Sequence, residues 1–298
     1  MLLLSTVSKP TIWGGTRLLP FGGDASISNL GQLYTAAGNR ELSSTVLNGP
    51  FAGESLYQVY QQHPELFGYD KYEGFPLLIG FVDAKENLSI QIHPHDEYAR
   101  RVEGKPFGKN ESWLFLEAPE SGSIINGCPC TSRAEVEEKI AQGDWLGIMG
   151  RLPVKQNDYV YVQSGTLHAL TAGSLVYEIQ QSTDITYRFW DYDRVDAQGH
   201  KRPLQLDKAL DVIDPAKRSE SIPCQEAHTY QHPYYHVTVT QAKGSLRNDA
   251  ASFCVVTLLD GAIALEQQTV QKGSSLILFP HEEIHFDGCA SVVVALPV

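Results

Sequence analysis

Four side chains that can ligate a divalent metal ion lie in one apolar, strand-rich stretch of the chain: Gln91, His93, Glu111 and His168. Gln91 and His93 stand two residues apart, so on a strand both side chains leave the same face. Pro94 then ends that strand. An ion bound by two imidazoles, one carboxylate and one amide oxygen still has room to coordinate water or substrate, as catalytic zinc sites require. The sequence therefore predicts one zinc-type site, which only a folded β structure can assemble.

Each of these residues taken alone has an ordinary explanation, because buried polar side chains are mostly just hydrogen-bonded. The joint pattern is more specific. The segment 157–168, with Asp158, Gly165 and His168 at fixed spacing, resembles the second motif of the cupin superfamily. In cupins a pair of ligands two residues apart, a Glu later in the sequence and this last His all point into a small β-barrel. Here Gln91 stands in place of the first His of the pair, and Gln163 stands where cupins prefer Pro.

Length and charge restrict the possible partners. With 298 residues, 42% of them hydrophobic, the chain can bury a large core, and its length suggests two domains. A net charge of -12 argues against a nucleic-acid or anionic-membrane surface, so an anionic substrate would need a local positive pocket.

The opening residues 1–4 lack a basic flank, and no long apolar stretch follows, so we expect a soluble, cytoplasmic protein.

The cysteines indicate a reducing compartment. There are 5 of them, an odd number without paired Cys-x-x-Cys spacing, which favours free thiols over a disulfide framework. Cys128 and Cys130 flank a proline and could bind metal or take part in redox chemistry. Without partner motifs, a turn with two small residues is the favoured interpretation.

The hydrophobic pattern predicts a mainly β fold with a few inserted helices, and the resemblance to cupins implies two cupin-like β-barrel or jelly-roll units. The expected helices share helical spacing or capping signals and cover residues 54–66, 132–142 and 203–213. Ser132 is placed to cap the second, and Pro203 to start the third. A strand is expected at 75–82.

The composition changes after Arg218 to short alternating strands separated by turn residues. We therefore expect a catalytic cupin-like domain at 1–218 and a C-terminal cupin-like β domain at 219–298. The layout of 272–285 repeats that of 157–168 with one extra residue, which makes an internal duplication plausible. The second copy has no upstream ligands, so His281 and His285 are expected to be surface or core histidines without a metal site.

Several motifs together resemble one family. Residues 75–84, 88–94, 108–113 and above all 177–188 are similar to type I mannose-6-phosphate isomerases of the short bacterial form, and the resemblance covers nearly the whole chain. It implies a zinc-dependent aldose–ketose isomerase that interconverts mannose 6-phosphate and fructose 6-phosphate. The family's metal ligands correspond to Gln91, His93, Glu111 and His168, and its active-site arginine corresponds to Arg188.

That reaction goes through a cis-enediolate, so it needs a base, an electrophile and a phosphate anchor. Zinc can be the electrophile, and Arg188 can grip the enediolate or the phosphate bidentately. Glu178, ten residues earlier on what is predicted as the same strand, is a candidate base. Lys109, two residues before Glu111, could contact phosphate or shuttle a proton. The structural alternatives are a solvated Lys109 and a Glu178–Arg188 ion pair.

The chain departs from the family pattern at Gly80, where the family usually has a lysine in Leu-x-Lys-Phe, and at residues 31–34. Two other functions remain open: a non-catalytic or altered-specificity sugar-phosphate-binding relative, and a cupin metal oxygenase, since two His and a carboxylate also suit non-haem iron. A small-molecule sugar phosphate is the expected partner. The sequence leaves the oligomeric state, the anomer preference and the metal used in the cell open.

Overall fold

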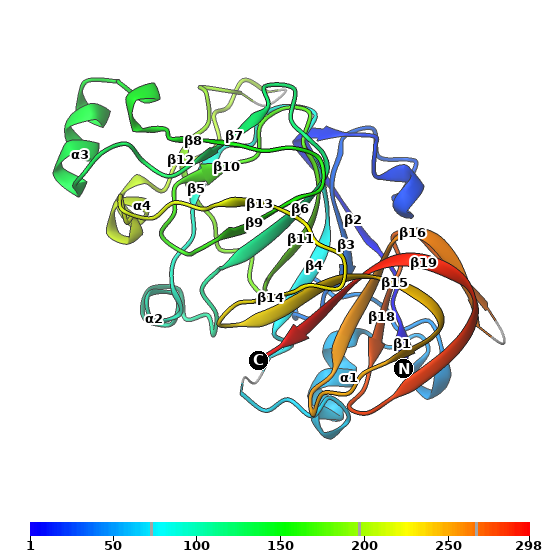
Figure 1. Ribbon diagram of the computed structural model, residues 1–298. Helices are drawn as coiled ribbons and strands as arrows, with labels where there is room; N and C mark the ends of the chain where they lie inside the picture. Colours follow the sequence, from blue (N-terminus) through cyan, green and yellow to red (C-terminus); the bar gives the residue numbers. More distant parts are fainter. Residues whose placement is uncertain (72–73, 196–197, 266–267) are drawn as a thin grey trace. The chain divides into compact units, whose positions relative to one another are not determined.

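The computed structural model describes residues 1–71, 74–195, 198–265 and 268–298 (Figure 1). It divides the chain into two compact units. Unit 1 comprises Met1–Pro10, Thr16–Phe81 and Cys224–Val298, and unit 2 comprises Thr11–Gly15 and Val82–Pro223. Both units are built mainly of strands with few helices, so the predicted fold class is confirmed. The predicted domain division at 218 and 219 stays a prediction.

Unit 2 contains the predicted ligands and arranges its strands in two groups. One sheet has the strand order β12-β5-β10-β7-β8, and β13, β9, β6 and β11 are neighbours in that order in another. The strands of unit 2 are β5 Ile90–Ile92, β6 Glu111–Glu117, β7 Ser123–Asn126, β8 Arg151–Pro153, β9 Asp158–Val162, β10 His168–Ala169, β11 Leu175–Gln181, β12 Tyr187–Trp190 and β13 Ser221–Pro223.

The core of unit 2 explains how polar residues come to point inward. On β6 the side chains alternate between faces, so Glu111, Trp113 and Phe115 share one face. Trp113 and Phe115 belong to the hydrophobic cluster of unit 2, and both are buried. Glu111 therefore extends the row of core side chains, and it has no exposed surface.

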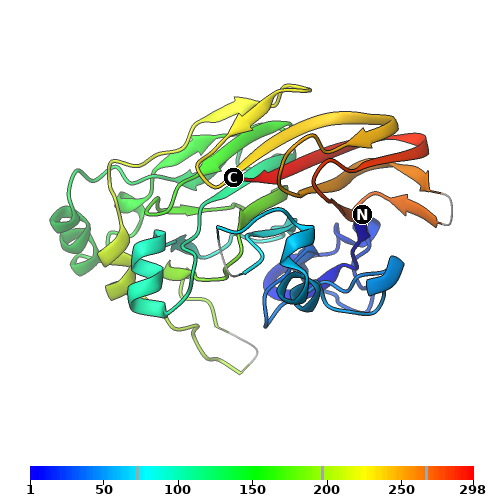
Figure 2. The ribbon, with the colours of Figure 1, turned by 90° about the horizontal axis from the view of Figure 1, so that it is seen from below.

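Unit 1 contains the longest strands. β15, β16 and β19, in yellow to red, run side by side in Figures 1 and 2, and β15 and β16 each pair antiparallel with β19. The strands of unit 1 are β1 Leu2–Leu3, β3 Leu30–Ala36, β14 Thr229–Gln231, β15 Tyr235–Arg247, β16 Cys254–Leu265, β17 Gln268–Gln271, β18 Ser275–Leu278 and β19 Glu283–Pro297. Two further strands, β2 Val7–Gly15 and β4 Leu77–Asp83, have some residues in unit 1 and some in unit 2. His281 and His285 are both exposed.

The three predicted helices are present. α1 covers Leu56–Gln62, α3 covers Arg133–Ala141 and α4 covers Leu206–Val212. The Ser132 side chain accepts a hydrogen bond from the backbone N–H of Glu135, so the predicted cap of α3 is confirmed.

Pro203 was the wrong start for α4, because residues 203–205 are held against β12 instead. The backbone N–H of Gln205 donates to the carbonyl of Arg188 at 2.9 Å, and the helix begins only afterwards.

The remaining helical pieces are short, and apart from Pro64–Leu66, which lies inside the expected helix 54–66, they were not expected. They are the helical turn α2 Asp96–Tyr98, the π-helical turn η4 Ala99–Glu103, and the 3-10 turns η1 Leu19–Phe21, η2 Gly49–Phe51, η3 Pro64–Leu66 and η5 Leu146–Ile148. Within the four described ranges, no helix has the length and apolar character needed to span a membrane.

Gly80 lies on β4 at a close approach of two backbones. The strand is buried along its whole length, and a Cβ placed on Gly80 would lie 2.3 Å from the carbonyl oxygen of Leu33 and 2.9 Å from the Cα of Tyr34. Both obstacles are backbone atoms of unit 1, which no side-chain rotation can move away. Glycine at this position is therefore required by packing, whatever residue the family usually has there.

We predict that Gly80→Ala and Gly80→Lys both destabilise the protein by about 2 kcal/mol or more, because the first side-chain carbon already collides. Chemical denaturation followed by circular dichroism measures the change. If Gly80→Ala were neutral and only Gly80→Lys were destabilising, the lysine head group rather than the backbone contact would be the obstacle. A Gly80→Lys protein with unchanged stability would contradict the packing argument.

Candidate metal centre

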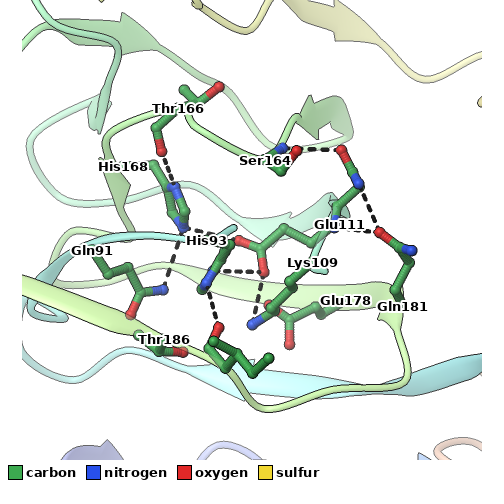
Figure 3. Close-up of polar contacts among 12 residues, drawn as sticks. Gln91, His93, Lys109, Glu111, Ser164, Thr166, His168, Glu178, Gln181 and Thr186 are labelled. Atoms are coloured by element: carbon green, nitrogen blue, oxygen red, sulfur yellow. Dashed lines mark hydrogen bonds and ion pairs between the residues drawn. The ribbon is translucent and has the colours of Figure 1, made fainter. Parts of the chain in front are cut away.

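Three residues from separate strand regions converge in the interior of unit 2 (Figure 3). His93 follows β5, Glu111 begins β6 and His168 begins β10. One ligand atom from each lies within 4.8 Å of the others, and the three side chains are 1%, 0% and 0% exposed. The structure thus brings together three of the four predicted ligands as one group.

Backbone carbonyls fix both imidazoles in one tautomer. Nδ1 of His93 lies 2.9 Å from the carbonyl oxygen of Ile185, and Nδ1 of His168 lies 2.8 Å from that of Thr166. A carbonyl can only accept, so each Nδ1 carries the proton and donates it. In the neutral rings Nε2 then holds a bare lone pair, which is the arrangement that metal-ligating histidines use.

These lone pairs face the carboxylate of Glu111. Nε2 of His93 lies 3.4 Å from Oε2, and Nε2 of His168 lies 3.2 Å from Oε1. Burial, reinforced by the positive charge of Lys109, lowers the pKa of His93 to about 3, so the contact between His93 and Glu111 is not an ion pair at neutral pH. His93 Nε2 and Glu111 Oε1 have no hydrogen-bond partner in the described part of the chain, and Glu111 Oε2 has Lys109 Nζ beside it.

The charge state of Glu111 agrees with this arrangement. Burial by itself raises the pKa of a carboxyl, but the Lys109 ammonium and the two imidazoles outweigh it and hold the pKa of Glu111 well below its ordinary value. A buried carboxylate that faces two acceptor nitrogens is costly unless a cation lies between them. The donor set of two imidazoles and one carboxylate fits a zinc-type ion.

Gln91 lies at the edge of the group. It is directly opposite His168 in the β5–β10 pairing, and its side-chain nitrogen lies 3.3 Å from Nε2 of His168. The amide oxygen can take the position of that nitrogen after a half-turn of the amide. The Gln91 side chain therefore lies beside the group, and its role as the fourth ligand stays a prediction.

Lys109 and Glu178 lie beside the group (Figure 3). Nζ of Lys109 is 3.0 Å from Oε2 of Glu111, and Lys109 is buried rather than solvated. Burial would lower the pKa of Lys109, but Glu111 and Glu178 outweigh it and raise the pKa. Glu178 accepts a hydrogen bond of 2.9 Å from Nε1 of Trp113. Its pKa is raised, first by burial and then by the charge of Glu111.

Arg188 lies on a different strand from Glu178, so the prediction of one shared strand was wrong. The residues between them form the connection from β11 to β12. In the β12–β5 pairing Arg188 is directly opposite Gln91, which is itself opposite His168. Directly opposite residues of antiparallel strands project to the same face, so the three form a row across the sheet.

Contacts with the segment before α4 hold Arg188. Its Nη1 donates to the carbonyl oxygen of Pro203 at 2.8 Å, and its backbone N–H donates to Gln205 at 3.0 Å. Its Nε is buried without a partner among the described residues. Burial, followed by the charge of Arg202, lowers the pKa of Arg188. No hydrogen bond or ion pair is found between Arg188 and Glu178 in the described ranges, so the alternative of a structural ion pair gains no support.

Sequence reasoning missed a polar network that holds the ligand-bearing segments together. Asn110, next to Glu111, donates from Nδ2 to Oε1 of Gln181 at 2.7 Å and accepts at Oδ1 from the N–H of Ser164 at 3.0 Å. Gln181 in turn donates to Asp96 at 3.0 Å. The adjacent pair Asn110–Glu111 was visible as a motif, but nothing in the sequence showed which segments its amide would join.

Comparison with known proteins gives relatives over the whole length. A family model described as "Phosphomannose isomerase type I, catalytic domain" matches residues 1–112. A mannose-6-phosphate isomerase of Streptococcus mutans is 36% identical over 309 residues, covering 99% of this chain and 97% of that protein. A mannose-6-phosphate isomerase of Bacillus subtilis is 39% identical over 231 residues, covering 78% of this chain and 71% of that protein.

The fold agrees with these relatives. A crystal structure of the mannose 6-phosphate isomerase from Bacillus subtilis superposes with a TM-score of 0.87 at 32% identity, covering 99% of this chain and 98% of the other. A phosphomannose isomerase mutant from Salmonella typhimurium, at 10% identity and a TM-score of 0.78, shares the fold. The cupin-like fold predicted from the sequence is thus confirmed. On the full-length relatives and this structural match, the chain belongs to the type I mannose-6-phosphate isomerases, a family of enzymes.

Proposed function

We propose that this protein is a zinc-dependent aldose–ketose isomerase that interconverts mannose 6-phosphate and fructose 6-phosphate through a cis-enediolate. The observation that carries the proposal is the buried group of His93, Glu111 and His168, in which Nε2 of His93 and Oε1 of Glu111 have no hydrogen-bond partner among the described residues. The relatives named as mannose-6-phosphate isomerases support the choice of substrate.

In this proposal His93, Glu111 and His168 hold the metal, with the amide oxygen of Gln91 as a fourth ligand. Zinc, when bound, supplies a Lewis acid that polarises the oxygens of the substrate near C1 and C2. The carbonyls of Ile185 and Thr166 keep both imidazoles oriented toward that position.

Glu178 is the proposed base that moves a proton between C1 and C2. A raised pKa suits this task, because a carboxylate with a higher pKa binds a proton more strongly and returns it to the neighbouring carbon. The hydrogen bond from Trp113 fixes the direction of its carboxyl group. Lys109, which lies against Glu111, contributes a positive charge beside the group.

Arg188 is the proposed group that contacts the anionic substrate. Because the protein has a net charge of -12, an anion needs a local positive site, and Arg188 provides one beside Gln91. Nη1 already donates a hydrogen bond to the Pro203 carbonyl, while the buried Nε has no partner among the described residues and can still donate. A planar guanidinium with free donors suits a phosphate or an enediolate oxygen.

The proposal is tested by a coupled assay for fructose 6-phosphate formed from mannose 6-phosphate by the purified, zinc-loaded protein. Turnover removes the alternative of a non-catalytic sugar-phosphate-binding relative. Elemental analysis of the active protein that finds a redox-inactive metal removes the oxygenase alternative. A zinc-loaded protein that produces no fructose 6-phosphate would contradict the proposed function.

For the metal, we predict that His93→Ala and Glu111→Ala each lose stoichiometric zinc, because each removes one of only three compactly placed ligands. Elemental analysis after dialysis measures the bound metal, and chelation of the wild type should abolish activity while most secondary structure remains. His285→Ala, at an exposed histidine, serves as the control and should keep full zinc. Full zinc occupancy in either ligand variant would show that the ligand set is wrong.

For the base, we predict that Glu178→Gln lowers kcat by about 100-fold or more, since general bases typically contribute 10²–10⁴-fold. The amide oxygen can still accept from Trp113, so zinc content and thermal stability should change little. Steady-state kinetics with mannose 6-phosphate gives the result. A kcat within threefold of the wild type would remove Glu178 from the proton transfer.

For the anion contact, we predict that Arg188→Lys lowers kcat/KM by roughly tenfold or more, or about 1.4 kcal/mol of transition-state binding. The charge is kept, but the planar fork is lost. Kinetics and thermal unfolding are measured on the same preparation. An unchanged kcat/KM together with a lower Tm would instead assign Arg188 to holding the segment before α4.

A further inference from the structure

Gln180 of unit 2 has a buried side-chain oxygen, Oε1, without a hydrogen-bond partner among the described residues. The residue is 2% exposed. Buried amides in folded proteins almost always pair their oxygen, so an unpaired one calls for an explanation.

Strand register places Gln180 beside the candidate metal centre. In the β6–β11 pairing Gln180 is directly opposite Glu111, and Glu178 is directly opposite Trp113. Because side chains alternate along a strand, Gln180 shares its face with Glu178, two residues earlier. Opposite residues on one face have Cβ atoms about 5 Å apart, so the Gln180 amide lies next to the ligand Glu111 and on the side of the proposed base.

The chemistry of an amide suits a neutral hydroxyl at this place. Glu111 and Glu178 already supply two carboxyl groups on this face, so a third charge would repel them. An amide offers an acceptor and a donor without charge, and a hydroxyl can pair with either. Leaving its oxygen unpaired costs the folded protein stability, and that cost is recovered when a ligand hydroxyl donates to it.

We propose that Gln180 is a specificity-determining residue that hydrogen-bonds a hydroxyl of the bound sugar next to the metal centre. This inference rests on the proposed function and extends it to a residue that neither the motifs nor the metal geometry assign. The ligand class is a polyhydroxylated sugar phosphate, and the contact is made to a hydroxyl rather than to the phosphate.

The neighbouring glutamine provides a matched control. Gln181 is also 2% exposed, but both its amide oxygen and its amide nitrogen are paired within the protein: Oε1 accepts from the N–H and the Nδ2 of Asn110, and Nε2 donates to Asp96. Replacing each by Met keeps an unbranched side chain of similar length and removes the amide. The two variants therefore compare an amide that is unpaired in the protein with one that is paired.

For Gln180→Met we expect normal zinc content, a Tm equal to or above that of the wild type, and a kcat/KM for mannose 6-phosphate at least tenfold lower. Gln181→Met should instead lower the Tm. Inhibition constants separate the two parts of the ligand: Gln180→Met should weaken a hexitol 6-phosphate about tenfold and leave inorganic phosphate unchanged.

Three outcomes would overturn the inference: a kcat/KM within twofold of the wild type, a loss of Tm equal to that of Gln181→Met, or an equal weakening of hexitol phosphate and inorganic phosphate. Failure of the proposed isomerase function is a separate result, seen as absent turnover in the wild type. The difference in hexitol 6-phosphate binding between wild type and Gln180→Met tests Gln180 in that case as well.

Discussion

The candidate metal centre depends on one electrostatic constraint: a fully buried carboxylate, Glu111, faces Nε2 of His93 and Nε2 of His168. Acceptors that point at one another in a buried site repel, because the low polarity of the interior screens them little. Lys109 neutralises one side of the carboxylate but does not lie between it and the imidazoles. In the proposed function, a divalent cation held by all three residues resolves the conflict.

Hydrogen bonds from neighbouring segments hold the two imidazoles and the carboxylate in this arrangement. Backbone carbonyls hold the Nδ1–H of each imidazole, and Asn110 ties the start of β6 to Gln181 and Ser164. These supports come from loops and strand ends, whereas Glu111 comes from the core row of β6. Hydrogen bonds from several neighbouring segments thus orient the side chains of the centre, as a functional site requires.

The sequence predicted the ligands because strand alternation and motif spacing are local properties. The Gln91–His93 step, the position of Glu111 and the helix cap at Ser132 needed no knowledge of the fold. Pairing register is not local. The row from Arg188 across Gln91 to His168, and the placement of Gln180 opposite Glu111, arise from which strands become neighbours, and no spacing in the sequence gives that.

The same distinction explains Gly80 and Pro203. The missing family lysine suggested a change in the active site, but the structure shows a backbone approach from Leu33 that only the folded sheet creates. A proline is a common first residue of a helix, yet here the carbonyl of Pro203 is used by Arg188, so the helix begins later. In both cases a long-range contact overrode a sound local rule.

The central claim is that one cation lies between His93, Glu111 and His168. Anomalous X-ray diffraction from crystals of active, zinc-loaded protein, recorded on both sides of the zinc absorption edge, tests it most directly. The account predicts a single peak in unit 2, about 2.0–2.2 Å from Nε2 of each histidine and from a Glu111 oxygen. Active crystals with no peak there, or with zinc bound only elsewhere, would contradict it.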